Sequence, residues 1–176
     1  VDYTIPPVPA TPEPIEIPEI KMQPLTSVWN TLPAPVYSAQ PVPMEALDQA
    51  SGFVLYRTKL IGHKSGNLVI SEPHDYALVL LNGEFVDTVY RDKGLWNVKL
   101  PKTNVENPVL DILVEGMGRV NFAQYLIDRK GITDRVTLNG MTLMQWEIYS
   151  LPMSSRYIQN LKANTQNLHD GVYFNG

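Results

Sequence analysis

Two Asn-Gly pairs, each placed between short apolar runs, constrain this chain more than any other feature of its sequence. The first is Asn82-Gly83 and the second is Asn139-Gly140. The flanking runs are 76–81 and 84–90 for the first pair, and 136–138, 141–143 and 146–149 for the second. A two-residue type I′ turn needs positive φ at both central residues, which Asn and Gly tolerate best. The sequence therefore predicts two β-hairpins.

Further short segments have the β-branched and aromatic composition of strands. They are 53–58, 68–70, 95–100 and 109–114. No long helical pattern separates them, so seven or eight strands recur at the spacing found in all-β domains. The expected fold is an antiparallel β-sandwich or jelly roll.

The N-terminal segment 1–43 has a different composition, because it holds eleven of the fifteen prolines. Proline removes backbone donors and favours extended polyproline conformation. Apolar residues such as Ile15, Ile17 and Trp29 are interleaved with the prolines, more than a solvated spacer needs. We therefore expect a strap that lies on a protein surface, and a disordered linker is the alternative interpretation.

Two segments flank the predicted strands. Residues 44–49 suggest a short helix stopped by Gly52, so the sandwich is expected over 44–153. Residues 154–176 are polar, with a short amphipathic helix near Tyr157 and an apolar triplet, 172–174, near the end. The triplet is typical of the start of a strand. We therefore expect a connector to a further β-domain, interrupted by a designed or proteolytic cut.

Composition excludes several classes of function. The formal net charge is −4 and the pI is about 5.3, so the chain offers no basic surface for nucleic acid. No apolar run approaches the ~18 residues of a membrane span. The chain has no cysteine, which excludes disulfides and thiolate chemistry. Its 176 residues are fewer than the ~250 of a complete (β/α)₈ barrel.

Catalytic and metal-binding patterns are weak. Asp111 and Glu115 share a strand face but are about 13 Å apart, whereas glycoside hydrolysis needs carboxyl groups roughly 5 to 9.5 Å apart. Other acids could converge in space, and scattered solvated carboxylates are the expectation. His63, His74 and His169 lie among turn residues, so no metal site is expected, and no cofactor motif occurs. The Gly116-Met117-Gly118 sequence indicates a tight turn.

Several ordered blocks resemble the region after the catalytic barrel in glycoside hydrolase family 35 β-galactosidases. The most specific block is 110–122, with sequence LDILVEGMGRVNF. The others are 44–49, 52–58, the hairpin at Asn82-Gly83, 128–132 and 146–152. The proline-rich strap and Tyr173-Phe174 also lie where that family has its barrel exit and a further jelly-roll domain.

The resemblance implies a galactose-binding-domain-like β-domain of a retaining exo-acting enzyme that removes terminal β-linked galactose with two barrel glutamates. Neither glutamate lies in this chain, so no catalytic residue is expected here. The implied partners are the enzyme's own barrel and a further β-domain, and an exported location is expected. Within the family, the loop at Arg119-Val120-Asn121 approaches the barrel mouth. The next residue is often tyrosine but is Phe122 here, which lacks the hydroxyl for a substrate contact.

Two questions stay open at the level of sequence. Arg119 and Asn121 either contribute to the barrel mouth or satisfy backbone and carboxylate groups, Glu115 among the candidates, within their own turn. Trp29, Trp96 and Trp146 are either sugar-stacking platforms or core and interface anchors. The function is accordingly an accessory module of a β-galactosidase or an autonomous galactoside-binding module, and a free-standing enzyme is the third alternative.

Overall fold

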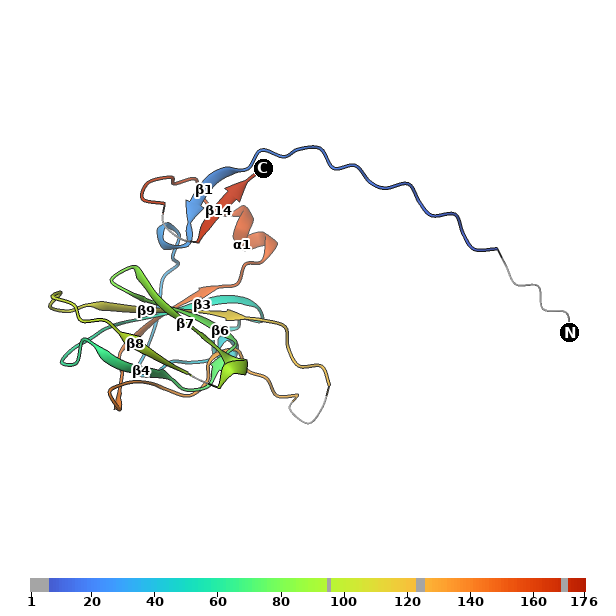
Figure 1. Cartoon of the computed structure of the whole chain (residues 1–176). Helices are drawn as coiled ribbons and strands as arrows, with labels where there is room; N and C mark the ends of the chain where they lie inside the picture. The colour runs from blue at the N-terminus through green and yellow to red at the C-terminus, as the bar shows by residue number, and fades with distance from the viewer. Residues whose placement is uncertain (1–6, 95, 123–125, 169–170) are drawn as a thin grey trace, which may run out of the picture.

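The computed structural model describes residues 7–94, 96–122, 126–168 and 171–176. Two antiparallel sheets face each other, and a small lobe built from both ends of the chain lies beside them (Figure 1). An extended N-terminal segment leads away from the small lobe. The predicted antiparallel β-sandwich is thus confirmed.

The larger sheet has six strands and contains the first predicted hairpin. In spatial order its strands are β2 (Val36–Ser38), β13 (Trp146–Leu151), β3 (Gly52–Lys59), β9 (Val109–Gly116), β6 (Tyr76–Leu81) and β7 (Glu84–Tyr90). Every neighbouring pair is antiparallel. The central strands β3 and β9 pair over their full length, so β9 ends at a fixed position and delivers the next segment to one edge of the sandwich.

The smaller sheet has four strands and contains the second hairpin. In spatial order its strands are β12 (Met141–Thr142), β11 (Val136–Leu138), β4 (Gly66–Ile70) and β8 (Asn97–Leu100). A separate two-stranded pair joins β5 (Pro73–His74) to β10 (Gly131–Ile132). This short pair was not expected from the sequence, and it brings residues 128–130 beside residues 74–75.

Both Asn-Gly turns have the predicted backbone geometry. Asn82 and Gly83 have φ of 53° and 82°, and Asn139 and Gly140 have φ of 51° and 82°. Positive φ at both central residues is the requirement of a type I′ hairpin turn. The two hairpins are therefore confirmed, although β12 is one residue shorter than the run that predicted it.

The main core lies between the two sheets. Alternate residues of each strand point into it, as Val54 and Tyr56 do from β3 and Leu68 and Ile70 do from β4. Trp146 is fully buried and packs edge-on against Tyr56, with ring centroids 6.4 Å apart. The Tyr56 hydroxyl donates to a backbone carbonyl at residue 42 and accepts from a backbone N–H at residue 132. Burial is the main reason that the pKa of Tyr56 is raised.

The helical elements are short. They are η1 (Val28–Asn30), η2 (Met44–Leu47), η3 (Arg91–Lys93) and α1 (Ser155–Gln159). The helix expected at 44–49 is thus a 3₁₀ helix that ends earlier, because Asp48 adopts the left-handed conformation with φ of 53°. Ser154 caps α1 by accepting a hydrogen bond from the N–H of Tyr157.

Part of the proline-rich strap has regular structure. β1 (Gln23–Ser27) pairs antiparallel with β14 (Val172–Asn175), so segments that precede and follow the sandwich meet in one small sheet. β2 joins the edge of the six-stranded sheet. The lobe packs on the outer face of that sheet, where Val28 contributes to a second apolar cluster with Leu55, Leu113 and Tyr149.

Candidate functional site

The loop that the family resemblance singled out begins after Gly116, the last residue of β9, and lies between β9 and β10 in the sequence. We call residues 117–122 and 126–127 the apolar loop; residues 123–125 lie outside the described part of the chain. Its exposed apolar side chains include Met117, Val120, Phe122, Leu126 and Ile127, with Phe122 84% and Ile127 89% exposed. Scattered single apolar residues are common on surfaces, but several together mark a contact surface.

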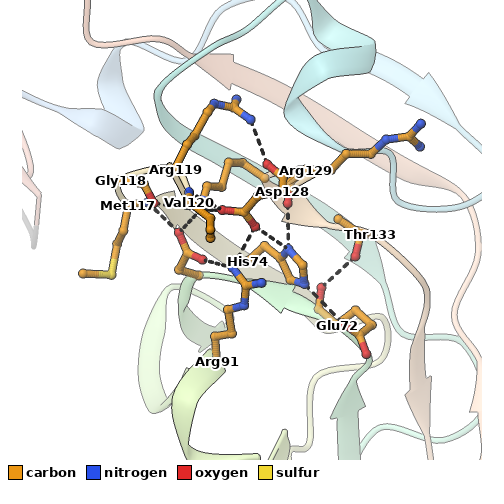
Figure 2. A network of polar contacts seen from close by, with 12 residues as sticks. Glu72, His74, Arg91, Met117, Gly118, Arg119, Val120, Asp128, Arg129 and Thr133 are labelled. Atoms are coloured by element: carbon orange, nitrogen blue, oxygen red, sulfur yellow. Dashed lines mark hydrogen bonds and ion pairs between the residues drawn. The ribbon is translucent and has the colours of Figure 1, made fainter. Parts of the chain in front are cut away.

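A buried lysine lies directly beneath the apolar loop. The side chain of Lys130 is 1% exposed, and its Nζ lies 2.6 Å from Asp75 Oδ2 and 2.8 Å from Asp128 Oδ2. It also donates to the carbonyl of Gly118 at 3.2 Å. An ammonium group has three donors, so each finds a partner here. Lys130 therefore ties the loop backbone to both aspartates, and Figure 2 shows Gly118 and Asp128 of this network.

Arg91 binds the same two aspartates from the other side. Its Nη1 lies 3.0 Å from Asp75 Oδ1 and 2.8 Å from Asp128 Oδ1. Asp75 and Asp128, with side chains 7% and 2% exposed, are thus each shared between Arg91 and Lys130. Two cations balance two anions, which is the condition under which buried charges are tolerated. We call these four residues the ionic base.

The ionic base also binds the loop backbone. Asp75 Oδ2 accepts a hydrogen bond from the N–H of Met117 at 2.9 Å, and Asp128 Oδ2 accepts one from the N–H of Val120 at 3.4 Å. With the bond from Lys130 to Gly118, three loop residues are held through their main chain. Their side chains contribute nothing to these bonds and are free to face outward.

Arg119 is held within its own domain. Its Nη1 donates to the carbonyl of Asp128 at 2.8 Å and lies 2.7 Å from Glu45 Oε1, and its Nη2 donates to the carbonyl of Ala50 at 2.9 Å. The arginine fork thus bridges the loop and the segment around η2. The carboxylate partner is Glu45, whereas the sequence suggested Glu115. Asn121 is exposed, as is Phe122.

The pKa values of Asp128 and Arg91 in the ionic base, and of the neighbouring Glu45, are shifted. Burial raises the pKa of a carboxyl group because it penalises the charged form, but at Asp128 hydrogen bonds from Lys130 and Arg91 outweigh it. The pKa of Asp128 falls from 3.8 to about 2. Burial is likewise outweighed at Glu45, where backbone hydrogen bonds and Arg119 lower the pKa. Burial opposes the charged form of Arg91 too, but hydrogen bonds to Asp75 and Asp128 raise its pKa.

His74 is not the surface residue that the sequence suggested. Its side chain is 12% exposed, and its ring nitrogens lie 2.7 Å from the carbonyl of Arg129 and 3.2 Å from Glu72 Oε2. Among the described residues, no group of three His, Cys, Asp or Glu side chains is arranged to hold a metal ion. His169 lies outside the described residues.

The carboxylates differ from the sequence expectation as well. Asp75, Asp111 and Asp128 are buried and paired, not scattered and solvated. Asp111 forms a bidentate pair with Arg57, with N–O distances of 2.7 and 3.0 Å. This hydrogen bond is the main cause that raises the pKa of Arg57. Asp111 is therefore committed to a cross-strand ion pair on the outer face of the six-stranded sheet.

The glycines of Gly116-Met117-Gly118 do not form the tight turn that the sequence indicated. Gly116 is the last residue of β9, and neither glycine has the left-handed φ that favours glycine. A Cβ at Gly118 would meet open space. The ionic base, rather than glycine conformation, shapes this segment.

Sequence patterns contain little indication of the ionic base. Three of its four pairs join residues 16, 37 and 55 positions apart, and only Asp128 and Lys130 are close in sequence. The one local signal is the charged stretch 128–130 before Gly131-Ile132, which stands out only through the family resemblance. Charged residues are rarely buried unless paired, and pairing is a property of the tertiary structure.

The sandwich domain has relatives among known proteins. Residues 41–152 match the protein family described as "Beta-galactosidase, first all-beta domain". The chain belongs to this family. The matched residues include both main sheets of the sandwich apart from β2, together with the ionic base and the apolar loop.

Individual relatives carry the name β-galactosidase. Beta-galactosidase 1 of Dictyostelium discoideum is 33% identical over 178 aligned residues, which cover 90% of this chain and 26% of that protein. A β-galactosidase of Xanthomonas manihotis is 36% identical, with 82% and 25% covered. Beta-galactosidase 17 of Arabidopsis thaliana is 42% identical, with 76% and 21% covered. The chain spans about a quarter or less of the length of these relatives.

None of the helices in the described residues has the length and apolar character needed to cross a membrane.

Proposed function

We propose that this chain is a non-catalytic β-domain of a family 35 β-galactosidase that braces the catalytic barrel through the apolar loop and shapes the barrel mouth. The parent enzyme hydrolyses terminal β-linked galactose, and its catalytic glutamates lie outside this chain. Family membership and the short span relative to the relatives support a part of a longer enzyme.

The observation that carries the proposal is the combination of a rigid base and an exposed apolar loop. Three buried side chains, those of Asp75, Asp128 and Lys130, bind the main chain of Met117, Gly118 and Val120, and Arg91 pairs with both aspartates. Phe122 and Ile127 are exposed on the same loop. A surface held this firmly binds with little loss of conformational entropy. Exposed Phe and Ile side chains gain about 1.5 to 3 kcal/mol each on burial, which favours an apolar partner surface.

The test compares the same substitutions in two contexts. The double variant Phe122→Asp, Ile127→Asp should leave the melting temperature of this chain nearly unchanged, because both side chains are exposed. In the full-length enzyme it should lower thermal stability and reduce kcat/KM for a chromogenic β-galactoside.

The matched control is Phe85→Asp, which also removes an exposed aromatic residue but lies on β7 away from the loop. It should leave both the chain and the full-length enzyme unaffected. A full-length enzyme that tolerates the double variant as well as the control would overturn the bracing role.

A second candidate function is galactoside binding, and one cavity favours it. A cavity of about 560 Å³ lies on the outer face of the six-stranded sheet, lined by Tyr37, Arg57, Gln145 and Glu147 among others. Tyr37 is 75% exposed and offers a ring face. Trp146 also lines the cavity but is fully buried, so Tyr37 replaces tryptophan as the candidate stacking residue.

Calorimetry with galactose and β-galactosides decides this second candidate. Binding should disappear in Tyr37→Ala, because Tyr37 lines the cavity. Phe85→Ala is the control, since it removes an exposed ring outside the cavity lining, and binding should persist in it. Absence of heat at millimolar ligand in the unchanged chain removes the hypothesis.

A further inference from the structure

The strap residues 7–22 expose apolar side chains along their whole length. Val8 is 91% exposed, Ile15 90% and Ile17 77%, and Ile20 and Met22 are each 58% exposed. These residues belong to no helix or strand, and the segment runs away from the sandwich (Figure 1). Within the described chain, the sandwich covers little of this apolar surface.

The backbone chemistry of the strap favours one conformation. Pro7, Pro9, Pro12, Pro14 and Pro18 each lack a backbone donor and fix φ near −65°. A polyproline II helix needs no internal hydrogen bonds, has three residues per turn and rises ~3.1 Å per residue. Side chains three positions apart then lie on one edge.

This three-residue period separates the charges from the apolar residues. The edges are Glu13, Glu16 and Glu19; then Pro14, Ile17 and Ile20; then Pro12, Ile15, Pro18 and Lys21. One edge is therefore purely acidic over three turns, and the other two are almost entirely apolar. The two-residue period of a strand would instead place Ile20 on the same face as Glu16.

We propose that residues 12–21 bind in polyproline II conformation to the catalytic portion of the same polypeptide, with both apolar edges buried and the acidic edge at the rim. This proposal rests on the proposed function, which supplies the partner. The complementary surface is an aliphatic groove with Lys or Arg side chains spaced about 9 Å apart along one rim, matching three residues at ~3.1 Å each.

The alternative occupant is a second copy of this chain, and two observations favour the catalytic portion. The chain spans about a quarter of its relatives, so most of the surface of such a protein lies outside it. A second copy carries the same net charge of −4, which opposes the approach of an acidic edge.

The test is a cysteine scan, which suits a chain without cysteine. Single cysteines replace each residue from 13 to 20, in this chain and in the full-length enzyme. Labelling by a thiol reagent at each site is followed by peptide mass spectrometry. In the full-length enzyme, positions 13, 16 and 19 should label as fast as in the chain alone. Positions 14, 15, 17, 18 and 20 should label at least tenfold more slowly.

A charge reversal tests the rim. The triple variant Glu13→Lys, Glu16→Lys, Glu19→Lys should restore fast labelling at position 17 in the full-length enzyme. Its control is Glu84→Lys, Glu106→Lys, Asp134→Lys, which changes the net charge equally at exposed sites of the sandwich and should leave position 17 protected.

Each outcome decides the proposal. A two-residue period, uniform fast labelling in the full-length enzyme, or indifference to charge reversal overturns it. Protection in this chain alone that rises with concentration assigns the strap to a second copy and also overturns it. If the strap is unprotected while Phe122→Asp, Ile127→Asp still impairs the full-length enzyme, only the strap proposal fails and the proposed function stands.

Discussion

The turn at Asn82-Gly83 and the apolar loop are held by opposite means. The turn needs only two residues with positive φ and the paired strands on either side. The apolar loop has no such local device, and its main chain is fixed by Asp75, 42 positions from Met117, and by Lys130, which follows the loop. Local conformation suffices for a turn of two residues. The apolar loop is longer, and side chains of the ionic base hold its main chain through hydrogen bonds.

The largest expected effect comes from breaking the ionic base. Lys130→Met leaves Asp75 and Asp128 buried with only Arg91 to pair them, and should lower the free energy of unfolding by about 3 to 5 kcal/mol. Urea denaturation measures this value. Lys99→Met, at an exposed position on β8, is the control and should have little effect. Equal, small losses in both variants would mean that the loop does not depend on its base.

The pH dependence of stability also tests the contribution of the ionic base. Because the folded-state pKa of Asp128 is lowered from 3.8 to about 2, its ionisation stabilises the fold above the unfolded pKa. This contribution is lost as pH falls from about 4 towards about 2. The difference in unfolding free energy between the unchanged chain and Asp128→Asn should therefore shrink across this window. Urea denaturation of both proteins at several pH values between about 4 and about 2 measures this difference.

A smaller effect tests the turn. Gly83→Ala places a Cβ at φ of 82° in open space, so the cost is backbone strain alone, roughly 1 to 2 kcal/mol. Gly118→Ala in the apolar loop should change stability by less than about 0.5 kcal/mol, because neither φ nor space opposes a side chain there. Thermal melts of the two variants provide the comparison. Equal losses would show that glycine conformation also shapes the loop.

Arg119→Lys should cost less than Lys130→Met, because it keeps a positive charge at its site. Lysine cannot reproduce the fork that reaches Glu45 and two carbonyls, so this chain should lose about 1 kcal/mol, or a few degrees of melting temperature. Arg135→Lys, with a long 3.9 Å contact to Asp134, is the control. An unchanged chain combined with a lower kcat/KM in the full-length enzyme would instead assign Arg119 to the barrel mouth. No change in either context would reduce Arg119 to a solvated surface residue.

Sequence patterns predicted the strands because the signal for each strand is local. The continuous apolar run 76–81, the β-branched and aromatic run 84–90 and the Asn-Gly pair between them predict that hairpin without reference to the rest of the chain. Patterns predicted the short helix at α1 for the same reason. They did not reveal β1 or β5, whose prolines and short length resemble loop until the partner strand is known.

The sequence by itself determined the β-class of the chain, its two hairpins and the proline-rich composition of its N-terminal segment. Only the tertiary structure decided which charges are buried, since Lys130 finds Asp75 across 55 residues. It also decided that the two ends of the chain pair as β1 and β14. The physical reason is the separation in sequence between the groups that interact. Backbone conformation follows from neighbours in sequence, whereas the neutralisation of a buried charge depends on groups that only the folded chain brings together.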